Sequence, residues 1–193
     1  KPVRRFPSWI LLCVVAVIPA ARAQTIDSWT PLEGPWGGVE VHAVAMTSAG
    51  DLLVGTPGGV FAAIQGSPWL PESDGLQGAA RDVRAFLGLG DGTLIAGTFG
   101  AGVMRRPPGG SWIPADGPPS FVTALAGSAG ESLCAGTASG VLRSRDAGRT
   151  WMQLTIGGRL LPVRDLAISG DTVHAATSDG VYRSFDDGVT WEA

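Results

Sequence analysis

The sequence repeats itself with a period of roughly 40 residues. Four tryptophans mark this period at intervals of 43, 39 and 40 residues, and a glycine stands three positions before each one. The pairs are Gly66 and Trp69, Gly109 and Trp112, Gly148 and Trp151, and Gly188 and Trp191. Each repeat also opens its first apolar run with a valine, namely Val41, Val83, Val122 and Val163. Such regularity indicates a tandem array in which one structural unit packs on the next.

The unit that fits this period is a four-stranded antiparallel β-sheet. In the second repeat the first strand is expected from Val83 to Leu89, and a turn at Gly90-Asp91-Gly92 leads to a second strand from Thr93 to Thr98. A third strand should start near Val103, and a fourth should contain Trp112. Helical repeats need long amphipathic stretches with few glycines, and none is present. The sequence therefore predicts an all-β fold, the β-propeller.

Four blades are expected in the chain, at 41–70, 83–113, 122–154 and 163–193. A surplus strand near 28–31 is expected before them, because Trp29 lies 40 residues before Trp69. This arrangement predicts part of a ring of six to eight blades, with a closed four-bladed ring as the alternative. The second strands carry a small residue where blades would converge, namely Gly55, Gly97, Gly136 and Ala176.

The first 23 residues have the pattern of a secretory signal peptide. Basic residues precede an apolar run from Trp9 to Ile18, and Ala21-Arg22-Ala23 provides a small-x-small cleavage signal. The run is too short to span a membrane, so the mature chain, 24–193, is predicted to be periplasmic or secreted and to have no membrane span. Cleavage removes four positive charges and no negative ones, which moves the formal net charge from −3 to −7. A chain of that sign disfavours nucleic acid as a partner.

Two segments match the pattern Ser-x-Asp-x-Gly-x-Thr-Trp. The matching residues are Ser144, Asp146, Gly148, Thr150 and Trp151 in one copy and Ser184, Asp186, Gly188, Thr190 and Trp191 in the other. This motif resembles the Asp-box, or BNR, repeat of sialidase-like propellers. A second pattern, Asp91-Gly92-Thr93-Leu94-Ile95-Ala96-Gly97-Thr98 followed by Gly102-Val103, is similar to the sensor propellers of bacterial signalling proteins. The resemblance implies that the motif stabilises the fold. Calcium held by an aspartate is the alternative.

Catalysis receives little support from the sequence. The tyrosine, arginine and aspartate set that a sialidase requires is absent, and no His or Cys spacing suits a metal site, so neither cofactor nor metal is predicted. A glycoside hydrolase of the Asp-box propeller type is the alternative, with Asp82 and Asp165 as carboxylates near first strands and further catalytic carboxylates outside this sequence.

The leading hypothesis is an exported, non-catalytic propeller that serves as a binding, sensing or scaffold module for protein or glycan. Polar residues at variable positions of the repeat are candidates for ligand contacts in the central funnel: His42, Arg84, Arg164 and Asp165. The loops between blades, 71–82, 113–121 and 154–162, vary most and are the other expected contacts.

Overall fold

The computed structural model describes residues 40–64, 68–127 and 132–193, so the predicted signal peptide and the strand expected near 28–31 lie outside the described residues. Within the described ranges the chain forms β-strands and one short 3₁₀ turn, η1 (Gly78–Arg81). None of the helical structure in these ranges has the length and apolarity of a membrane span. The all-β prediction is confirmed.

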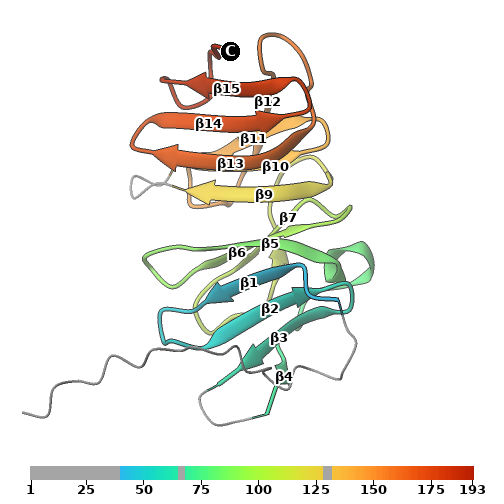
Figure 1. Ribbon diagram of the computed structural model, residues 1–193. Coiled ribbons are helices and arrows are strands. Elements are labelled where there is room, and N and C mark those ends of the chain that lie inside the picture. Colours follow the sequence, from blue (N-terminus) through green and yellow to red (C-terminus); the bar gives the residue numbers. More distant parts are fainter. Residues whose placement is uncertain (1–39, 65–67, 128–131) are drawn as a thin grey trace, which may run out of the picture. The chain divides into compact units, whose positions relative to one another are not determined.

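The strands form four antiparallel sheets that follow one another in the sequence (Figure 1). Sheet 1 contains β1 (Ala43–Met46), β2 (Leu52–Thr56), β3 (Gly59–Ala63) and β4 (Leu70–Pro71). Sheet 2 contains β5 (Val83–Gly88), β6 (Leu94–Thr98), β7 (Val103–Arg106) and β8 (Ile113–Pro114). Sheet 3 contains β9 (Val122–Gly127), β10 (Leu133–Thr137), β11 (Gly140–Ser144) and β12 (Met152–Leu154). Sheet 4 contains β13 (Val163–Ser169), β14 (Thr172–Thr177) and β15 (Gly180–Ser184), and a bridge between Arg183 and Glu192 takes the place of a fourth strand.

The fourth strands are shorter than expected, and the tryptophans precede them. Trp112 was expected inside a strand, but β8 begins one residue later. The reason is that its backbone N–H bonds to the carbonyl of Asp74, and its indole N–H bonds to the carbonyl of Glu72. Trp112 is thus paired with the loop that precedes sheet 2, and its backbone is not available to the sheet ladder.

The first strands of successive sheets lie beside one another, and the small residues of the second strands allow this. A β-carbon placed on Gly97 would lie 2.4 Å from Val122 Cγ1, which is closer than two carbon atoms can approach. The corresponding distance is 2.9 Å between Gly55 and Val83, and 2.8 Å between Gly136 and Val163. The expected close approach of neighbouring sheets at these glycines is confirmed.

Three apolar clusters fill the seams between sheets, and the tryptophans belong to them. Trp112 is 2% exposed and packs with residues of sheets 1 and 2. Trp151, 6% exposed, packs between sheets 2 and 3, and Trp191 packs against the cluster between sheets 3 and 4. Each sheet therefore depends on the next to cover its apolar side, as in other repeat folds.

The outer faces of sheets 1 and 4 do not cover each other. Figure 1 shows the sheets stacked in sequence order, with β1–β4 and β13–β15 at the two ends of the series. Val44 and Met46 of sheet 1 are 63% and 68% exposed, and Val181 of sheet 4 is 64% exposed. The described residues therefore do not form the closed four-sheet ring considered as an alternative.

Candidate functional site

Each first strand of sheets 2, 3 and 4 contains a β-bulge near its start. Val83 pairs with Thr98 and Ala85 with Gly97, so Arg84 is the extra residue in β5. Thr123 and Arg164 are the extra residues of β9 and β13 for the same reason. His42 occupies the same position of the repeat, immediately before β1. A bulge turns a side chain out of the regular alternation of a strand, and bulges are common beside functional sites.

His42 of sheet 1 and Arg84 of sheet 2, which occupy this position of the repeat, meet in a polar group. The Arg84 guanidinium donates to both carboxylate oxygens of Asp82, at 2.7 and 2.9 Å, and its Nη1 lies 3.5 Å from His42 Nδ1. The hydrogen bond to Asp82 raises the pKa of Arg84, and partial burial acts against this. The expected contacts His42 and Arg84 are thus neighbours. Asp82, which the sequence suggested only as a carboxylate for glycoside hydrolysis, holds the Arg84 guanidinium in place beside His42.

His42 has an unusual environment for a polar side chain. Its side chain is 9% exposed, and Nε2 has no hydrogen-bond partner among the described residues. The nearby carboxylate oxygen Oδ1 of Asp82 lies 3.9 Å from Nε2, beyond hydrogen-bond range. A buried nitrogen without a partner is uncommon in proteins and leaves a donor or acceptor free for a ligand or water.

Two aromatic rings extend this group. Phe99 and Phe121 stack with ring centroids 4.4 Å apart, and the Arg84 guanidinium lies 4.7 Å from the Phe99 centroid. Phe99 is 47% exposed and Phe121 is 46% exposed, so each keeps much of its surface open to solvent. We call this set the rim cluster: it comprises His42, Asp82, Arg84, Phe99 and Phe121.

The aromatic pair was missed in the sequence analysis, although the repeat carries a signal for it. Phe99 directly follows the second strand, where the other repeats have Pro57, Ala138 and Ser178. Phe121 directly precedes the first strand, where the other repeats have Glu40, Asp82 and Pro162. Both are large apolar departures at positions that are otherwise small or polar, and each was detectable by aligning the repeats.

The remaining expected funnel residues lie apart from the rim cluster. Arg164 and Asp165 are exposed, and Asp165 accepts a hydrogen bond from the N–H of Leu166 at 2.9 Å. Within the described ranges, no recorded contact joins either residue to the cluster. In sheet 3 the bulge residue has a different role, because the Thr123 hydroxyl bonds to the carbonyls of Val163, at 2.6 Å, and Gly136, at 3.0 Å. Thr123 therefore ties sheet 3 to sheet 4.

The Ser-x-Asp-x-Gly-x-Thr-Trp segments form tight turns at the opposite ends of the strands. Asp146 accepts hydrogen bonds from the N–H groups of Arg149 and Thr150 and from the hydroxyls of Ser144 and Thr150. Partial burial acts to raise the pKa of Asp146, but these hydrogen bonds prevail and lower it to about 2. Both carboxylate oxygens have protein partners.

The second copy of the turn repeats this geometry. Asp186 accepts from the hydroxyl and N–H of Thr190 and from the Ser184 hydroxyl, and these bonds lower its pKa to about 2. Ser184 Oγ in turn accepts from the N–H of Gly188 at 2.8 Å. Within the described part of the chain, no group of three or more His, Cys, Asp or Glu side chains could hold a metal ion.

Each of the two turns contains a left-handed residue that is not glycine. Ala147 has φ of 56° and Asp187 has φ of 60°, and each immediately precedes a left-handed glycine, Gly148 or Gly188. The carbonyls of both residues accept a hydrogen bond from the preceding sheet: Arg105 Nε donates to Ala147 at 3.2 Å, and Arg143 Nη1 donates to Asp187 at 3.1 Å. The turns therefore fasten neighbouring sheets together.

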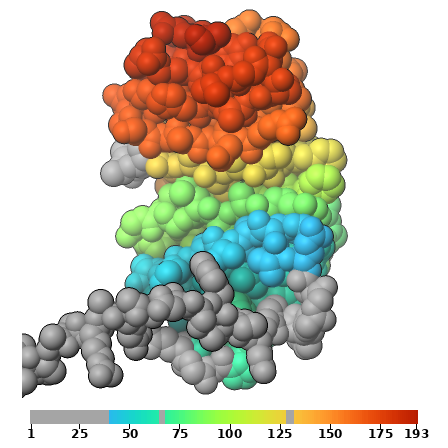
Figure 2. All heavy atoms as spheres, in the orientation of Figure 1, coloured from blue at the N-terminus to red at the C-terminus, as the bar shows by residue number. Residues whose placement is uncertain are grey.

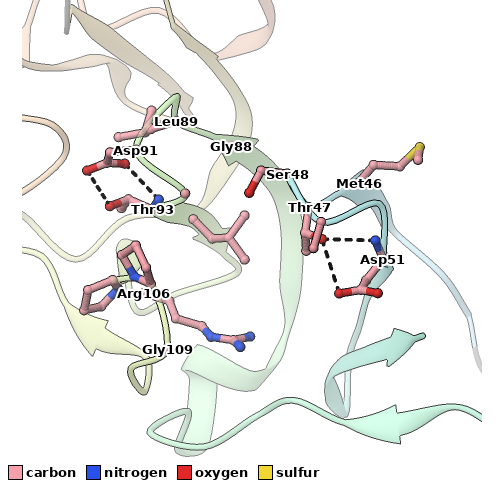
Figure 3. Close-up of a pocket in the computed structure, with 15 residues that line it drawn as sticks. Met46, Thr47, Ser48, Asp51, Gly88, Leu89, Asp91, Thr93, Arg106 and Gly109 are labelled. Carbon is pink, nitrogen blue, oxygen red and sulfur yellow. Dashed lines mark hydrogen bonds between the residues drawn. The ribbon is translucent and has the colours of Figure 1, made fainter. Parts of the chain in front are cut away.

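A pocket of about 300 Å³ lies between the turns of sheets 1 and 2 (Figure 3). Its polar groups already have partners: Asp91 accepts from Thr93 at 2.8 and 3.0 Å, and Asp51 bonds with Thr47. Arg106, which also lines the pocket, pairs with Glu72 at 2.9 Å. The pocket is consequently a weaker candidate than the rim cluster.

The loops between sheets are only partly available for ligands. Loop 71–82 includes η1 and places Leu76, 2% exposed, in the core between sheets 1 and 2. Loop 154–162 buries Ile156 completely. The variable composition of these loops therefore reflects packing over the seams as well as surface contacts.

No known family model matches the sequence, and no curated protein matches it. Solved structures do resemble it. The extracellular domain of a protein assigned as a hybrid two component system from B. thetaiotaomicron is 12% identical over 86% of this chain and 26% of its own, with a TM-score of 0.69. The GH74 enzyme of Niastella koreensis is 15% identical over 85% of this chain and 33% of its own, with a TM-score of 0.65.

A third similar structure is Ika4, a computationally designed protein. It is 16% identical, with a TM-score of 0.64, and the match covers 82% of this chain and 99% of Ika4. In contrast, the chain spans about a quarter to a third of the two natural proteins. These similarities establish the β-propeller fold, and at such identities they establish the fold alone.

Proposed function

We propose that this protein is an extracytoplasmic, non-catalytic propeller that binds or senses a protein or glycan ligand at the rim cluster. The observation that carries the proposal is the half-exposed stack of Phe99 and Phe121 beside the Arg84–Asp82 pair. Phenylalanine and other aromatic side chains, together with arginine, are enriched at the recognition surfaces of proteins. Extracellular domains of two component systems among the similar structures, together with the signal-peptide pattern, support the location.

The charges of the rim cluster favour a neutral ligand. Asp82 offsets the charge of Arg84 through two short hydrogen bonds, so the pair presents little net charge. The two phenylalanine faces provide apolar surface, while Arg84 Nη1, whose contact with His42 Nδ1 is long at 3.5 Å, retains hydrogen-bonding capacity. A sugar ring or an aromatic side chain of a protein has the required flat face together with hydroxyl or carbonyl groups.

The same geometry disfavours glycoside hydrolysis, the alternative. That reaction needs one carboxyl group that holds a proton and a second carboxylate across the scissile bond. Both carboxylate oxygens of Asp82 accept hydrogen bonds from Arg84, so neither oxygen is free to carry a proton to a leaving group. Glu40, 3.8 Å from His42 Nδ1, is a second carboxylate, but its side chain is 77% exposed, whereas acid catalysis by carboxyl groups relies on an apolar setting.

Screening the chain on glycan and peptide arrays, followed by titration calorimetry of each positive, tests the proposal. Replacing both rings, Phe99→Ala with Phe121→Ala, should weaken binding at least about tenfold, because the stacking surface is lost. Ile113→Ala is the matched control, since Ile113 is 48% exposed but lies on β8. A ligand whose affinity is unchanged in the double variant, or an absence of ligands on both arrays, would contradict the proposal.

A further inference from the structure

Every internal seam of this fold is built from the same two faces. The earlier sheet provides what we call the receiving face, which contains a valine of its third strand. In sheets 2 and 3 this face also contains an arginine two residues after the valine, and the arginine donates to a carbonyl in the turn of the next sheet. The later sheet provides the incoming face: the first-strand valine and the large apolar residue three positions after it. Each face is covered only where the complementary face of a neighbouring sheet lies against it.

Sheet 4 has a receiving face that nothing covers among the described residues. The equivalent valines Val60, Val103 and Val141 are 0%, 4% and 0% exposed, whereas Val181 is 64% exposed. The arginine of this face is open as well. The Arg143 side chain is 8% exposed, but that of Arg183 is 50% exposed.

Arg183 has none of the inter-sheet bonds that its equivalents make. Where Arg105 and Arg143 donate to carbonyls of the next turn, Arg183 lies 3.5 Å from Glu192 and 4.3 Å from the ring centroid of Phe185, all within sheet 4. The Arg183 guanidinium is available to donate to the carbonyl of a further turn, but the described residues contain no such turn.

Sheet 1 has the matching incoming face, which no other part of 40–64, 68–127 or 132–193 covers. Val41 is 46% exposed, whereas Val83, Val122 and Val163 at the same position are 0%, 1% and 1% exposed. Val44 corresponds to Phe86, which packs in the seam between sheets 1 and 2. Val44 itself is 63% exposed, and Met46, on the same side of β1, is 68% exposed. In Figure 2 the surface of the segment that contains β1 is seen in blue.

We propose that these two faces bind each other between two copies of this chain, with sheet 4 of one copy against sheet 1 of the other. The contact is head to tail, and such contacts either close into a ring or continue as a filament. Two copies joined by two identical seams contain eight sheets, a number that lies within the usual range of about four to eight blades for propellers. A second copy is the occupant proposed for each open face, because it carries the same pair of complementary faces that forms every internal seam.

The seam between copies differs from the internal ones in a way that suits a separable contact. Ala176 stands where sheets 1 to 3 have Gly55, Gly97 and Gly136. At the internal seams a β-carbon there would lie within 2.9 Å of the incoming valine, so Ala176 must hold Val41 farther away. His174 also replaces the buried Leu53, Ile95 and Cys134. The new seam is consequently looser and more polar than the internal seams.

Sedimentation velocity of the full chain over a roughly hundredfold concentration range tests this inference. The expected result is a species of twice the chain mass that dissociates on dilution. Val44→Asp alters the incoming face and Val181→Asp alters the receiving face, so each variant alone should be monomeric, with a dissociation constant raised at least about tenfold. Ile113→Asp, at a similarly exposed position on β8, should assemble like the unmodified chain.

Mixing the two variants gives the decisive result. Each retains one intact face, so the mixture should form a one-to-one pair through a single seam, which a face-to-face dimer cannot do. Circular dichroism of each variant verifies that the sheets are intact. An unmodified chain that stays monomeric, a variant that still dimerises alone, or a mixture that forms no pair would each overturn the proposal. None of these outcomes depends on the ligand at the rim cluster.

Discussion

The Arg143 guanidinium reaches from β11 to the backbone carbonyl of Asp187, 3.1 Å away in the turn of the next sheet. Its side chain is 8% exposed, so the bond is shielded from water. The Arg145 side chain, 61% exposed, meets the carboxylate of the same aspartate at 2.9 Å. Asp187 therefore joins sheets 3 and 4 through a buried contact with Arg143 and an exposed one with Arg145, and the Ser132 hydroxyl donates to the same carboxylate.

Removing the buried contact should cost more than removing the exposed one. We expect Arg143→Met to lower the free energy of unfolding by about 2 kcal/mol, because a buried carbonyl loses a charged donor. Arg145→Met should lower it by about 0.5 kcal/mol, the usual contribution of an exposed ion pair. Urea denaturation followed by tryptophan fluorescence measures both. Equal effects would show that burial of the guanidinium is unimportant.

The close approach of sheets at Gly97 should make this position intolerant of any side chain. Gly97→Ala places a methyl group against Val122, and we expect a loss of about 1–3 kcal/mol of unfolding free energy from overpacking. Gly90→Ala serves as the control, since a β-carbon there meets no atom within 4 Å. Adding Val122→Ala to Gly97→Ala should recover part of the loss, and thermal unfolding of the three variants checks this.

The turn aspartates should make stability depend on acid pH. Because the pKa values of Asp146 and Asp186 are about 2 in the folded protein, against an ordinary value of 3.8, the stability they provide is present above pH 3.8. It is lost as the pH falls through 3.8 towards 2. We expect the melting temperature of the Asp146→Asn variant to fall less across this range than that of the unmodified chain. Parallel curves would contradict the assignment.

Ala147 occupies a conformation that glycine adopts more readily. With φ of 56°, its methyl group is strained, so Ala147→Gly should raise the free energy of unfolding by about 0.5–1 kcal/mol. Ala138, in a turn of sheet 3 and without a positive φ, is the control. Ala138→Gly should be destabilising, because glycine adds entropy only to the unfolded chain. Chemical denaturation of both variants gives the comparison.

Cys134 should be inert in the folded protein. Burial raises the pKa of its thiol to about 12, and the charge of Asp187 adds to the effect. Since the thiolate is the reactive form, a disulfide reagent at pH 8 should modify Cys134 only after denaturation of a chain that starts at Gln24 and therefore lacks Cys13, the other cysteine of the sequence. Following the released chromophore with and without urea measures this. Rapid modification of the folded chain would show that β10 opens readily.

Much of this fold could be predicted from the sequence because each repeat meets the same requirement, the close packing of one sheet against the next. Three second-strand glycines and the valines they face recur in register, and that pairing determines how closely the sheets approach. The variable position represented by His42 and Arg84 could be recognised in the same way. Arg84 lies at a bulge and His42 at the equivalent position before β1, and the structure brings these two residues together.

What the repeat could not show is which positions of neighbouring sheets meet. Phe99 belongs to sheet 2 and Phe121 to sheet 3, and their stacking depends on the angle between those sheets. The left-handed backbone of Asp187 could not be predicted either, because Asp187 occupies an unspecified position of the motif, directly before its glycine. Likewise, Leu76 lies in a loop that composition suggested was exposed, but it fills a gap beside Trp112.

The bulge in the first strands of sheets 2, 3 and 4 has an evolutionary consequence. In β5 and β13 it gives the strand one side chain, Arg84 or Arg164, that does not follow the inward and outward alternation of its neighbours. Thr123, the extra residue of β9, instead bonds to backbone carbonyls and contributes to packing. Substitutions of the two arginines leave the apolar clusters between the sheets intact, so selection can change what the molecule recognises at one sheet without loss of the fold.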